Sequence, residues 1–238
     1  MYGIINKTNV QNVKITMIDK LLSYIAPHPC YSCRKIGSIL CDYCKYDIIE
    51  DEFSGCVVCG GTNLGRGLCT SCSPLFSRGW CVGERTDVLR KIIDDYKFER
   101  MYEAHKILAE LLANRLPVLP EDCIIVPIPT IPSHIRQRGY DHTLLIAKYL
   151  AQLKKVKYES LIQRNQYSVQ RGRTKKDRYL QAERAFMVAK MPENPTILLI
   201  DDIVTTGATL QAAASLLHQH GAKEVWVACI ARQPLENK

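Results

Sequence analysis

The sequence predicts an α/β fold, in which a parallel-sheet domain follows a small cysteine-rich module. Two observations predict it. From about residue 80 onward, short apolar runs alternate with segments of helical periodicity, a pattern typical of a parallel sheet covered on both faces. Before residue 73, eight of the eleven cysteines form four Cys-x-x-Cys pairs. We therefore expect an extension at 1–27, a cysteine-rich module at 28–76 and an α/β domain at 77–238.

The elements of the α/β domain follow from their apolar patterns. Residues 87–113 place apolar side chains at helical spacing, with a break near 98–101, which predicts two helices. Residues 123–128, CIIVPI, predict a short buried strand, because prolines end the run. The further expected elements are a helix at about 141–154, a buried strand at 196–201, a helix from residue 205 that stops at Gly221, and a strand at 224–232. Cys123 and Cys229 lie beside apolar strands and are expected to be buried core thiols.

The four Cys-x-x-Cys pairs predict two structural zinc sites. Each pair can offer two sulfurs from one tight turn, and two turns complete a tetrahedral thiolate site that leaves no position open for water. Disulfides and an iron–sulfur cluster are weaker alternatives, since the sequence has no secretory signal. The spacing leaves open whether the pairs combine sequentially or in a cross-braced order. The expected ligands are Cys30, Cys33, Cys41, Cys44, Cys56, Cys59, Cys69 and Cys72.

The composition is that of a folded protein with one strongly basic region. Hydrophobic residues make up 47% of the chain and charged residues 24%. Residues 154–190 carry eleven Lys and Arg against three acidic residues, an excess equal to the formal net charge of the whole chain, +8. Such a segment indicates phosphate or nucleic-acid partners, or else a solvated basic loop. We expect no membrane span and no signal peptide, hence a cytoplasmic protein, with Met17 as an alternative start.

The segment LLIDDIVTTGATL, residues 198–210, joins an apolar strand to a helix through two acids and a Thr/Gly turn. Ligands of parallel sheets lie beyond the carboxyl ends of the strands, so Asp201 and Asp202 are expected at the binding edge. Free N–H groups at a helix start, threonine hydroxyls and a glycine favour a phosphate. Carboxylates favour sugar hydroxyls or Mg²⁺. The two halves together predict a ribose phosphate, with a plain strand–helix junction as the alternative.

Taken whole, LLIDDIVTTGATL resembles the phosphoribosyl-pyrophosphate (PRPP) signature of type I phosphoribosyltransferases. VPIP at 126–129, RQRGYDHT at 136–143 and QYSVQRGRTKKDRYLQAERAF at 166–186 resemble elements of the ComF/GntX family, as does the double Cys-x-x-Cys ribbon. That family usually shows Asn-Gln where this chain has Asp141 and His142. The resemblance spans about residues 28–232 and implies a type I phosphoribosyltransferase fold behind a double zinc ribbon.

The resemblance implies a role for each matched residue. The catalytic residues would be Asp201, Asp202, Arg171, Arg173 and Lys175. PRPP or its phosphates would be bound by Asp201, Asp202, Thr205, Thr206, Gly207, Ala208, Thr209, Arg136 and Arg138, with Mg²⁺ accompanying PRPP. The basic segment corresponds to a mobile hood, which could also bind nucleic acid through Arg171, Arg173, Lys175, Lys176 and Arg178. His142 lies in the family element and is expected near the pocket, whereas the other histidines of interest (His28, His134, His218 and His220) are expected at the surface or in local hydrogen bonds.

The family resemblance implies a role in natural transformation. A protein of this kind would help to internalise or handle single-stranded DNA, together with a helicase-like competence ATPase and other competence proteins. Two alternatives stay open: an active Mg²⁺-dependent phosphoribosyltransferase of nucleotide metabolism with an unidentified acceptor, and a regulator that senses PRPP without catalysis. The cations of the basic segment would suit either PRPP or DNA, so the sequence does not separate these functions.

Overall fold

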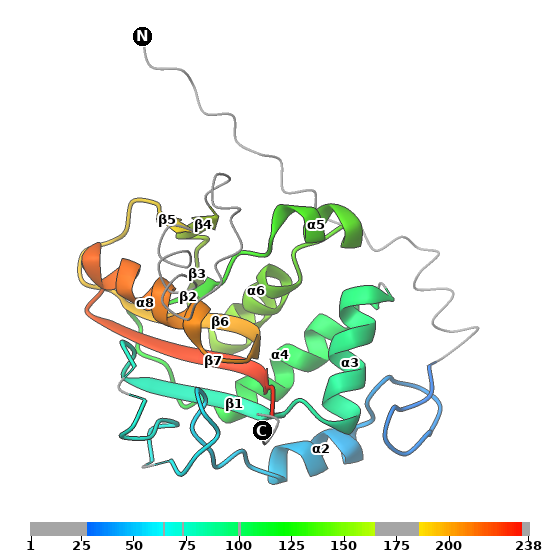
Figure 1. Ribbon diagram of the computed structural model, residues 1–238. Coiled ribbons are helices and arrows are strands. Elements are labelled where there is room, and N and C mark those ends of the chain that lie inside the picture. The colour runs from blue at the N-terminus through cyan, green and yellow to red at the C-terminus, as the bar shows by residue number, and fades with distance from the viewer. Residues whose placement is uncertain (1–27, 64, 73, 100, 165–185, 235–238) are drawn as a thin grey trace, which may run out of the picture.

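The structure, a computed structural model, describes residues 28–63, 65–72, 74–99, 101–164 and 186–234. The predicted extension at 1–27 and most of the basic segment lie outside the described residues. Figure 1 shows the arrangement of the elements. In chain order these are α2 (Asp42–Glu50), β1 (Arg78–Glu84), α3 (Asp87–Phe98), α4 (Ala104–Arg115), β2 (Cys123–Pro127), α5 (Pro132–Arg138), α6 (His142–Lys154), β3 (Lys157–Tyr158), β4 (Ile162–Arg164), β5 (Phe186–Val188), β6 (Thr196–Val204), α8 (Ala208–Gln219) and β7 (Glu224–Arg232).

A five-stranded sheet, in the order β1-β7-β6-β2-β3, forms the centre of the molecule. Every pairing in it is parallel, as the unbroken apolar runs predicted. The predicted strands at β2, β6 and β7 are confirmed, and Cys123 and Cys229 are buried within them. The prediction that the β6 strand ends at Asp201 was wrong, because its ladder with β7 continues to Val204, opposite Arg232. The short strands β3, β4 and β5 and the edge strand β1 were not predicted.

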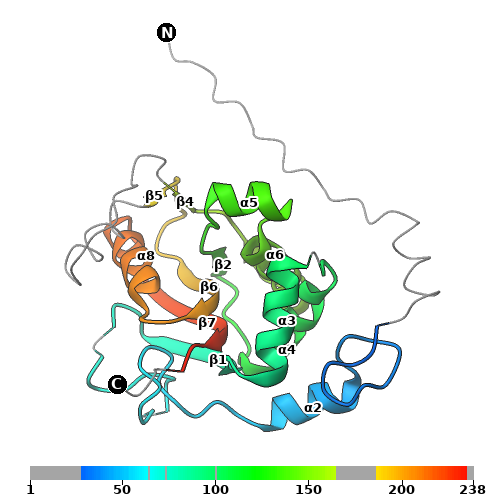
Figure 2. The same ribbon diagram turned by 45° about the vertical axis from the view of Figure 1, so that its right-hand side comes forward.

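Helices cover both faces of the sheet, which explains why its strands are apolar on both sides. Figure 2 shows α8 on one side and α3, α4 and α6 on the other. Leu108, Leu112 and Ile146 from the three-helix side are completely buried against sheet residues such as Ile200. On the α8 side, Leu217 is buried in a second cluster with the β4–β5 hairpin. The predicted break between α3 and α4 is confirmed at residues 99–103.

The connections create a topological switch point at the carboxyl edge of the sheet. The chain leaves β2 toward α6 on one face, whereas it leaves β6 toward α8 on the other face. β2 and β6 are neighbours in the sheet. From β2 the chain continues to β3 on one side, and from β6 it continues to β7 on the other side. Ligands of open parallel sheets bind at such a switch point. The residues that follow β2 and β6 therefore form the edge at which a site is expected.

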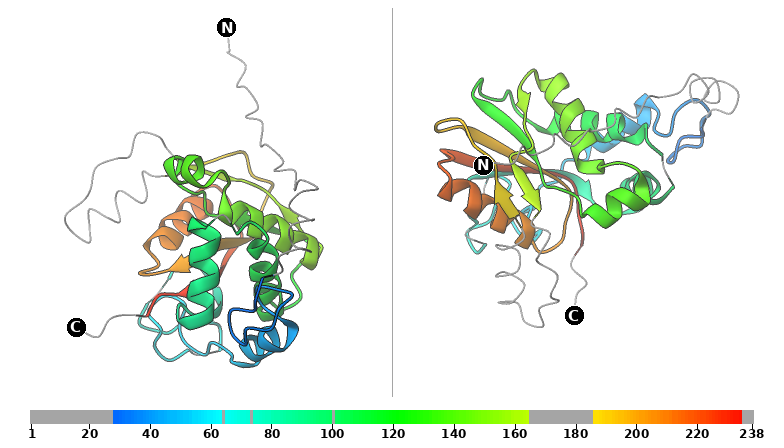
Figure 3. Two further views of the ribbon diagram at one scale, coloured as in Figure 1. Left: turned by 90° about the vertical axis from the view of Figure 1, so that its right-hand side faces the viewer. Right: turned by 90° about the horizontal axis from the view of Figure 1, so that it is seen from above.

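The cysteine-rich module packs against the α/β domain rather than standing apart. Helix α2 lies against α4 in both views of Figure 3, and the Lys45 ammonium pairs with Glu110 of α4 at 2.7 Å. The Tyr31 hydroxyl donates to Asp95 of α3 at 2.5 Å. The guanidinium of Arg115 donates to the carbonyl oxygens of Ile48 and Ile49, just as a cation at a helix C-terminus satisfies its last acceptors. These contacts fix the N-terminal half of the module on α3 and α4.

Candidate functional site

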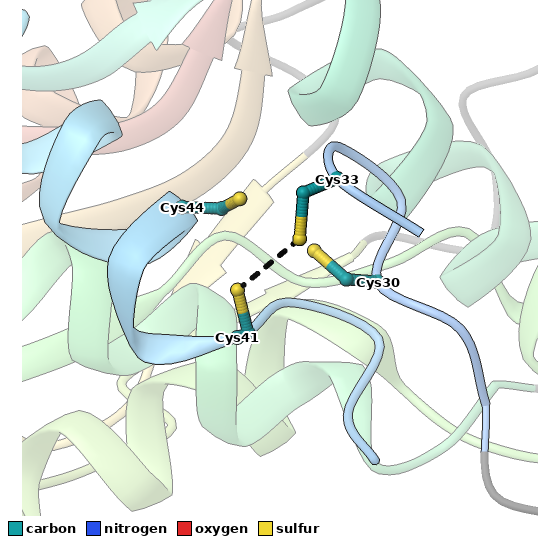
Figure 4. A group of neighbouring side chains, drawn as sticks. All are labelled: Cys30, Cys33, Cys41 and Cys44. Carbon is teal, nitrogen blue, oxygen red and sulfur yellow. Dashed lines mark hydrogen bonds between the residues drawn. The ribbon is translucent and has the colours of Figure 1, made fainter. Parts of the chain in front are cut away.

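Two groups of four cysteine sulfurs are assembled in the cysteine-rich module. The first, the Cys30 group, consists of Cys30, Cys33, Cys41 and Cys44, and the second, the Cys56 group, of Cys56, Cys59, Cys69 and Cys72; within each, all sulfurs lie within 4.8 Å of one another. Figure 4 shows the four thiols of the Cys30 group converging on one point. All eleven cysteines are free thiols. The pairs combine sequentially, so the cross-braced order is excluded.

The geometry of both groups fits zinc. Sulfurs bound at about 2.3 Å from a tetrahedral zinc ion are about 3.8 Å apart. The observed sulfur separations are 3.6 Å for Cys33 and Cys41 and 3.6 Å for Cys59 and Cys69. Hydrogen bonds to Cys72 and neighbouring sulfurs lower the pKa of the Cys69 thiol to about 7, whereas burial and the same hydrogen bonds raise the pKa of Cys72. A first thiolate therefore forms readily at Cys69, and a bound metal would have to displace the remaining protons. Zinc at these sites would be structural, because four thiolates complete its coordination.

Asp201 and Asp202 lie in the second half of β6, toward the carboxyl end of the strand. Successive residues of a strand point to opposite faces, so the two carboxyls have different surroundings. Asp202 faces the three-helix side, where its Oδ2 atom lies 2.5 Å from Lys97 Nζ and 2.5 Å from His142 Nε2. Asp201 is partly exposed, and its Oδ1 atom accepts from the Asp202 backbone N–H at 2.9 Å. Asp201 is therefore the carboxyl that a ligand can reach, while Asp202 is engaged inside the protein.

Lys97 and His142 come from two helices that the sequence did not connect with Asp202. Lys97 stands in the last turn of α3, and His142 begins α6 directly after its N-cap, Asp141. The Arg138 guanidinium, which has only donors, lies 2.9 Å from His142 Nδ1. Nδ1 therefore accepts, and the ring proton is on Nε2, which donates to Asp202. His142 was expected near the pocket and lies beside Asp202. Lys97 is the residue that sequence reasoning missed.

The two carboxyls have opposite pKa shifts. Burial, together with the neighbouring charge of Asp202, raises the pKa of Asp201 from its ordinary value to about 7. Burial acts to raise the pKa of Asp202 as well, but the hydrogen bond from His142 and the charge of Lys97 outweigh it and hold this pKa well below its usual range. Asp202 is therefore a permanent anion at neutral pH, and Asp201 titrates close to pH 7.

The Thr/Gly turn follows β6 at once and leads into α8. Gly207 is the N-cap, with a left-handed backbone at φ 71°, and its carbonyl accepts the first helical hydrogen bond from Gln211. Thr205 and Thr206 are exposed, and the Thr206 hydroxyl lies 3.4 Å from the Ala208 amide. The first amides of any helix lack intrahelical acceptors and carry its positive dipole end. The turn, residues 205–209, can therefore receive an anionic group.

Cationic side chains surround the acids. Arg138 is buried at the end of α5, where its guanidinium also stacks 5.3 Å from the centre of the Phe98 ring. Arg164 donates from Nε to the Pro129 carbonyl at 2.8 Å. Burial lowers the pKa of Arg164, while the charge of Asp201 acts in the opposite direction, which places that carboxyl within electrostatic reach. Arg136, also predicted to bind phosphate, is exposed on α5. Arg171, Arg173, Lys175, Lys176 and Arg178, predicted as hood, catalytic or nucleic-acid residues, lie outside the described residues.

The other histidines divide between local hydrogen bonds and the surroundings of the site. His218 bonds to the Leu75 and Ala222 carbonyls and His220 to the Leu216 carbonyl, as expected. His134, on α5, is only partly buried, and burial together with the charges of Arg138 and Lys97 lowers its pKa. Several cationic side chains and two acids therefore lie together at this edge of the sheet, and cations grouped in this way favour an anionic ligand.

Known proteins with similar sequences share most of this chain. Residues 144–238 match the phosphoribosyl transferase domain. The chain is 29% identical over 210 residues to competence protein F of Haemophilus influenzae, covering 81% of this chain and 90% of that protein. It is 27% identical to competence protein ComFC of Streptococcus pneumoniae, over 81% of this chain and 87% of that protein. It is also 27% identical to the DNA utilization protein YhgH of Salmonella typhi, over 87% and 97% of the two chains.

Two solved structures align with parts of this chain. A glutamine PRPP amidotransferase from B. subtilis, in complex with ADP and GMP, aligns with 52% of this chain at 20% identity and a TM-score of 0.39; the alignment spans 25% of that enzyme. An adenine phosphoribosyltransferase from Thermoanaerobacter pseudethanolicus aligns with 57% of this chain and 83% of its own, at 15% identity and a TM-score of 0.35.

The predicted resemblance to the ComF/GntX family is confirmed by these relatives and by the matched domain. The predicted fold class is confirmed as well: a parallel-sheet, phosphoribosyltransferase-like α/β fold, preceded by cysteine groups that fit zinc ribbons. Within the described ranges, no helix combines the length and the apolar character that crossing a bilayer requires.

Proposed function

We propose that this chain binds PRPP, or ribose 5-phosphate, at the carboxyl edge of its sheet and acts in the handling of incoming single-stranded DNA. One observation carries the proposal: the Thr/Gly turn at the start of α8 lies directly behind a ligand-accessible acid, at the switch point between β2 and β6. A helix start binds phosphate, and a carboxylate binds hydroxyls. A sugar phosphate supplies both groups at once.

The proposed ligand would be held as follows. The 5-phosphate accepts from the amides and hydroxyls of residues 205–209, and Asp201 accepts from the ribose hydroxyls. Asp202 keeps its contacts with Lys97 and His142 and acts as the fixed negative charge that orients both side chains. Asp201 and the ligand's own phosphates offer the hard oxygen donors that Mg²⁺ prefers, and Mg²⁺ bound there would neutralise charge on the diphosphate. Arg138, Arg164 and exposed Arg136 are the cations available to the diphosphate.

The cellular role comes from the relatives. Two are named competence proteins and one a DNA utilization protein, and the alignments cover most of both chains. We propose the same process for this chain, namely natural transformation in the cytoplasm alongside a helicase-like ATPase. Single-stranded DNA would be bound by the basic segment, where eleven cations meet three acids across residues 154–190.

Phosphoribosyl transfer is the second candidate function, favoured by the cations near the acids. Breaking the bond between the anomeric carbon and the diphosphate oxygen leaves negative charge on the departing diphosphate. Lys97, Arg138 and Arg164 could stabilise that charge from fixed positions. The acceptor that would form the new bond to the anomeric carbon is unidentified. A PRPP sensor without chemistry is the third candidate.

Calorimetry of the zinc-loaded protein tests the pocket. We expect PRPP with Mg²⁺ to bind wild type and to lose at least tenfold in affinity in Thr206→Ala/Thr209→Ala, which removes two hydroxyl donors at about 1.4 kcal/mol per tenfold. Thr86→Ala, which removes an exposed hydroxyl at the N-cap of α3, is the matched control. Absence of binding to the wild type would refute the pocket. If PRPP binds, release of diphosphate with a panel of nucleobases separates the transferase from the sensor.

A steep loss of DNA affinity between low and moderate salt tests the nucleic-acid function. Each phosphate that the protein contacts contributes a slope of about −0.7 to the dependence of the logarithm of affinity on the logarithm of salt concentration for single strands. Replacing Arg171, Arg173, Lys175 and Lys176 by glutamine should reduce this slope by about three. An unchanged slope would move the DNA site elsewhere on the chain.

A further inference from the structure

Val58, which lies between two ligands of the Cys56 group, approaches the turn at residues 205–209 (the phosphate turn), although more than 130 residues of sequence separate them. A methyl group built on Gly207 would lie 3.2 Å and 3.5 Å from the two γ carbons of Val58, which stands between the ligands Cys56 and Cys59. The contact is possible because residue 207 has no side chain. Val58 is partly buried and packs on the apolar cluster on the α8 side of the sheet. The side chain between two predicted zinc ligands therefore packs against the backbone of the turn.

Two further contacts join the cysteine-rich module to β7 and α8, one beside each Cys-x-x-Cys pair of the Cys56 group. The Arg232 guanidinium, at the end of β7 opposite Val204, packs so tightly on Gly60 that a methyl group there would lie 2.7 Å from its central carbon. Arg232 is only 2% exposed, and its Nε and Nη2 atoms have no hydrogen-bond partner among the described residues. Leu75, just after the last ligand, donates its N–H to Gln211 and accepts from His218, both on α8.

Among the described residues, the Cys30 group makes no comparable contact with the turn. Its contacts run to α3 and α4 through Tyr31 and Lys45, on the opposite face of the sheet from α8. The two metal groups are thus alike in chemistry and different in position. Loss of metal from the Cys30 group would loosen the packing on α3 and α4. Loss of metal from the Cys56 group would instead remove the side-chain packing against residues 205–209.

We infer that Val58 is a positioning residue for the phosphate turn, and that metal in the Cys56 group, but not in the Cys30 group, sets the affinity of the turn for a sugar phosphate. The inference rests on the proposed ribose-phosphate site for its ligand. The physical coupling is direct packing: four thiolates on one metal fix the knuckle, the knuckle fixes Val58, and Val58 limits the backbone conformations open to Gly207. A turn that is already ordered loses less entropy when the phosphate binds.

Three full-length variants test the coupling. Val58→Ala removes both γ carbons, Val58→Ile keeps them, and Val88→Ala removes the same atoms from a partly buried valine in the first turn of α3. We expect Val58→Ala to weaken binding of ribose 5-phosphate by roughly three- to twentyfold, with Val58→Ile and Val88→Ala within twofold of wild type. Zinc content should stay at the wild-type value in all three. Equal affinity of Val58→Ala and wild type would overturn the inference.

Hydrogen exchange of the ligand-free protein separates this inference from the proposed function. Val58→Ala should speed exchange of the amides at 206–209 by at least threefold and leave the amides of α3 unchanged. Cys69→Ser, which disables the Cys56 group, should do the same, whereas Cys33→Ser, in the other group, should not. If exchange is faster in Val58→Ala and Cys69→Ser but wild type does not bind ribose 5-phosphate, the ligand assignment is refuted and the coupling is supported. Unchanged exchange at 206–209 in both Val58→Ala and Cys69→Ser would refute the coupling, independently of which ligand the turn binds.

Discussion

Replacing Asp202 by asparagine removes the charge that holds Lys97 in the interior. The Lys97 and Asp202 side chains are only 13% and 10% exposed, and their ion pair is 2.5 Å long. Removing one partner of a buried pair costs about 3–5 kcal/mol, because the other charge is left unpaired. The asparagine oxygen still accepts one hydrogen bond from Lys97 or His142, so we expect the lower end, about 3 kcal/mol of unfolding free energy. Urea unfolding of the zinc-loaded protein measures it.

Asp201→Asn is the matched comparison, with the same change of atoms one residue earlier. The pKa of Asp201 is raised from 3.8 to about 7, so the folded state disfavours its ionised form. Three pKa units correspond to a ceiling of about 4 kcal/mol at 1.36 kcal/mol per unit. Since the side chain is partly exposed and water screens its charge, we expect Asp201→Asn to stabilise the protein by about 1 kcal/mol.

The pH dependence of the two variants gives the sign of each effect. A raised pKa makes Asp201 costly as pH rises from 3.8 through 7, so the gain from Asp201→Asn should be larger at pH 8 than at pH 6. The lowered pKa of Asp202 gives a contribution that is fully present above 3.8 and is lost only as pH falls below it. Between pH 6 and pH 8 the penalty of Asp202→Asn should change only through Asp201, whose pKa the Asp202 charge raises. Losing that charge relieves ionised Asp201 more at pH 8 than at pH 6, so the penalty should be slightly smaller at pH 8. Equal losses of stability in the two variants would refute the assignment of the buried anion.

Three further predictions address the cysteine module and the turn. A methyl group on Gly67 would lie 1.7 Å from the Gly79 carbonyl oxygen, whereas one on Gly65 meets no described atom within 4 Å; both residues have positive φ. In native mass spectrometry, Gly67→Ala should therefore carry one zinc ion per chain, whereas Gly65→Ala should carry two. Two zinc ions in both variants would contradict the close packing of Gly67 on Gly79. Gly207→Ala should lower the free energy of unfolding by about 1–2 kcal/mol, because alanine disfavours the left-handed φ of this position. The loss should be larger when Val58 is present than in Val58→Ala, and a double-mutant cycle in urea unfolding measures this coupling. Affinity for ribose 5-phosphate should rise from pH 6 to pH 8 more in wild type than in Asp201→Asn, since only the ionised carboxyl accepts from two hydroxyls; parallel calorimetric pH profiles would exclude Asp201 from the site.

Local patterns predicted the elements that are long and regularly apolar. The run TILLI and the helix after Thr206 can be read from periodicity because burial alone specifies them. Strand β1 was missed, because RGWCVGE contains two glycines and charged ends and becomes a strand only by pairing with β7. The helix α2 begins at a cysteine ligand, and its position depends on packing against α4 rather than on its own sequence.

Local patterns predicted only the contiguous part of the candidate site, and His142 entered the prediction through the family element that contains it. Asp201, Asp202 and the turn lie within one segment, whereas Lys97 comes 105 positions before Asp202 and reaches it through the arrangement of α3. Nothing in the spacing of Lys97 distinguishes it from a solvated helix residue. The sequence analysis did not distinguish the accessible acid from the buried one. Strand alternation shows that the two carboxyls point to opposite faces, but which face is buried depends on the helices that cover it. The contact between Val58 and Gly207 is of the same non-local kind.

Amide chemical shifts on addition of ribose 5-phosphate test the central claim most directly. The first amides of α8 and the preceding turn are predicted to bind the phosphate, so the signals of residues 206–209 should shift and saturate in wild type. Inorganic phosphate should shift the same signals with weaker affinity, because it lacks the ribose hydroxyls that Asp201 accepts. Shifts confined to other segments, or none at saturating ligand, would contradict a ribose-phosphate site at the carboxyl edge of the sheet.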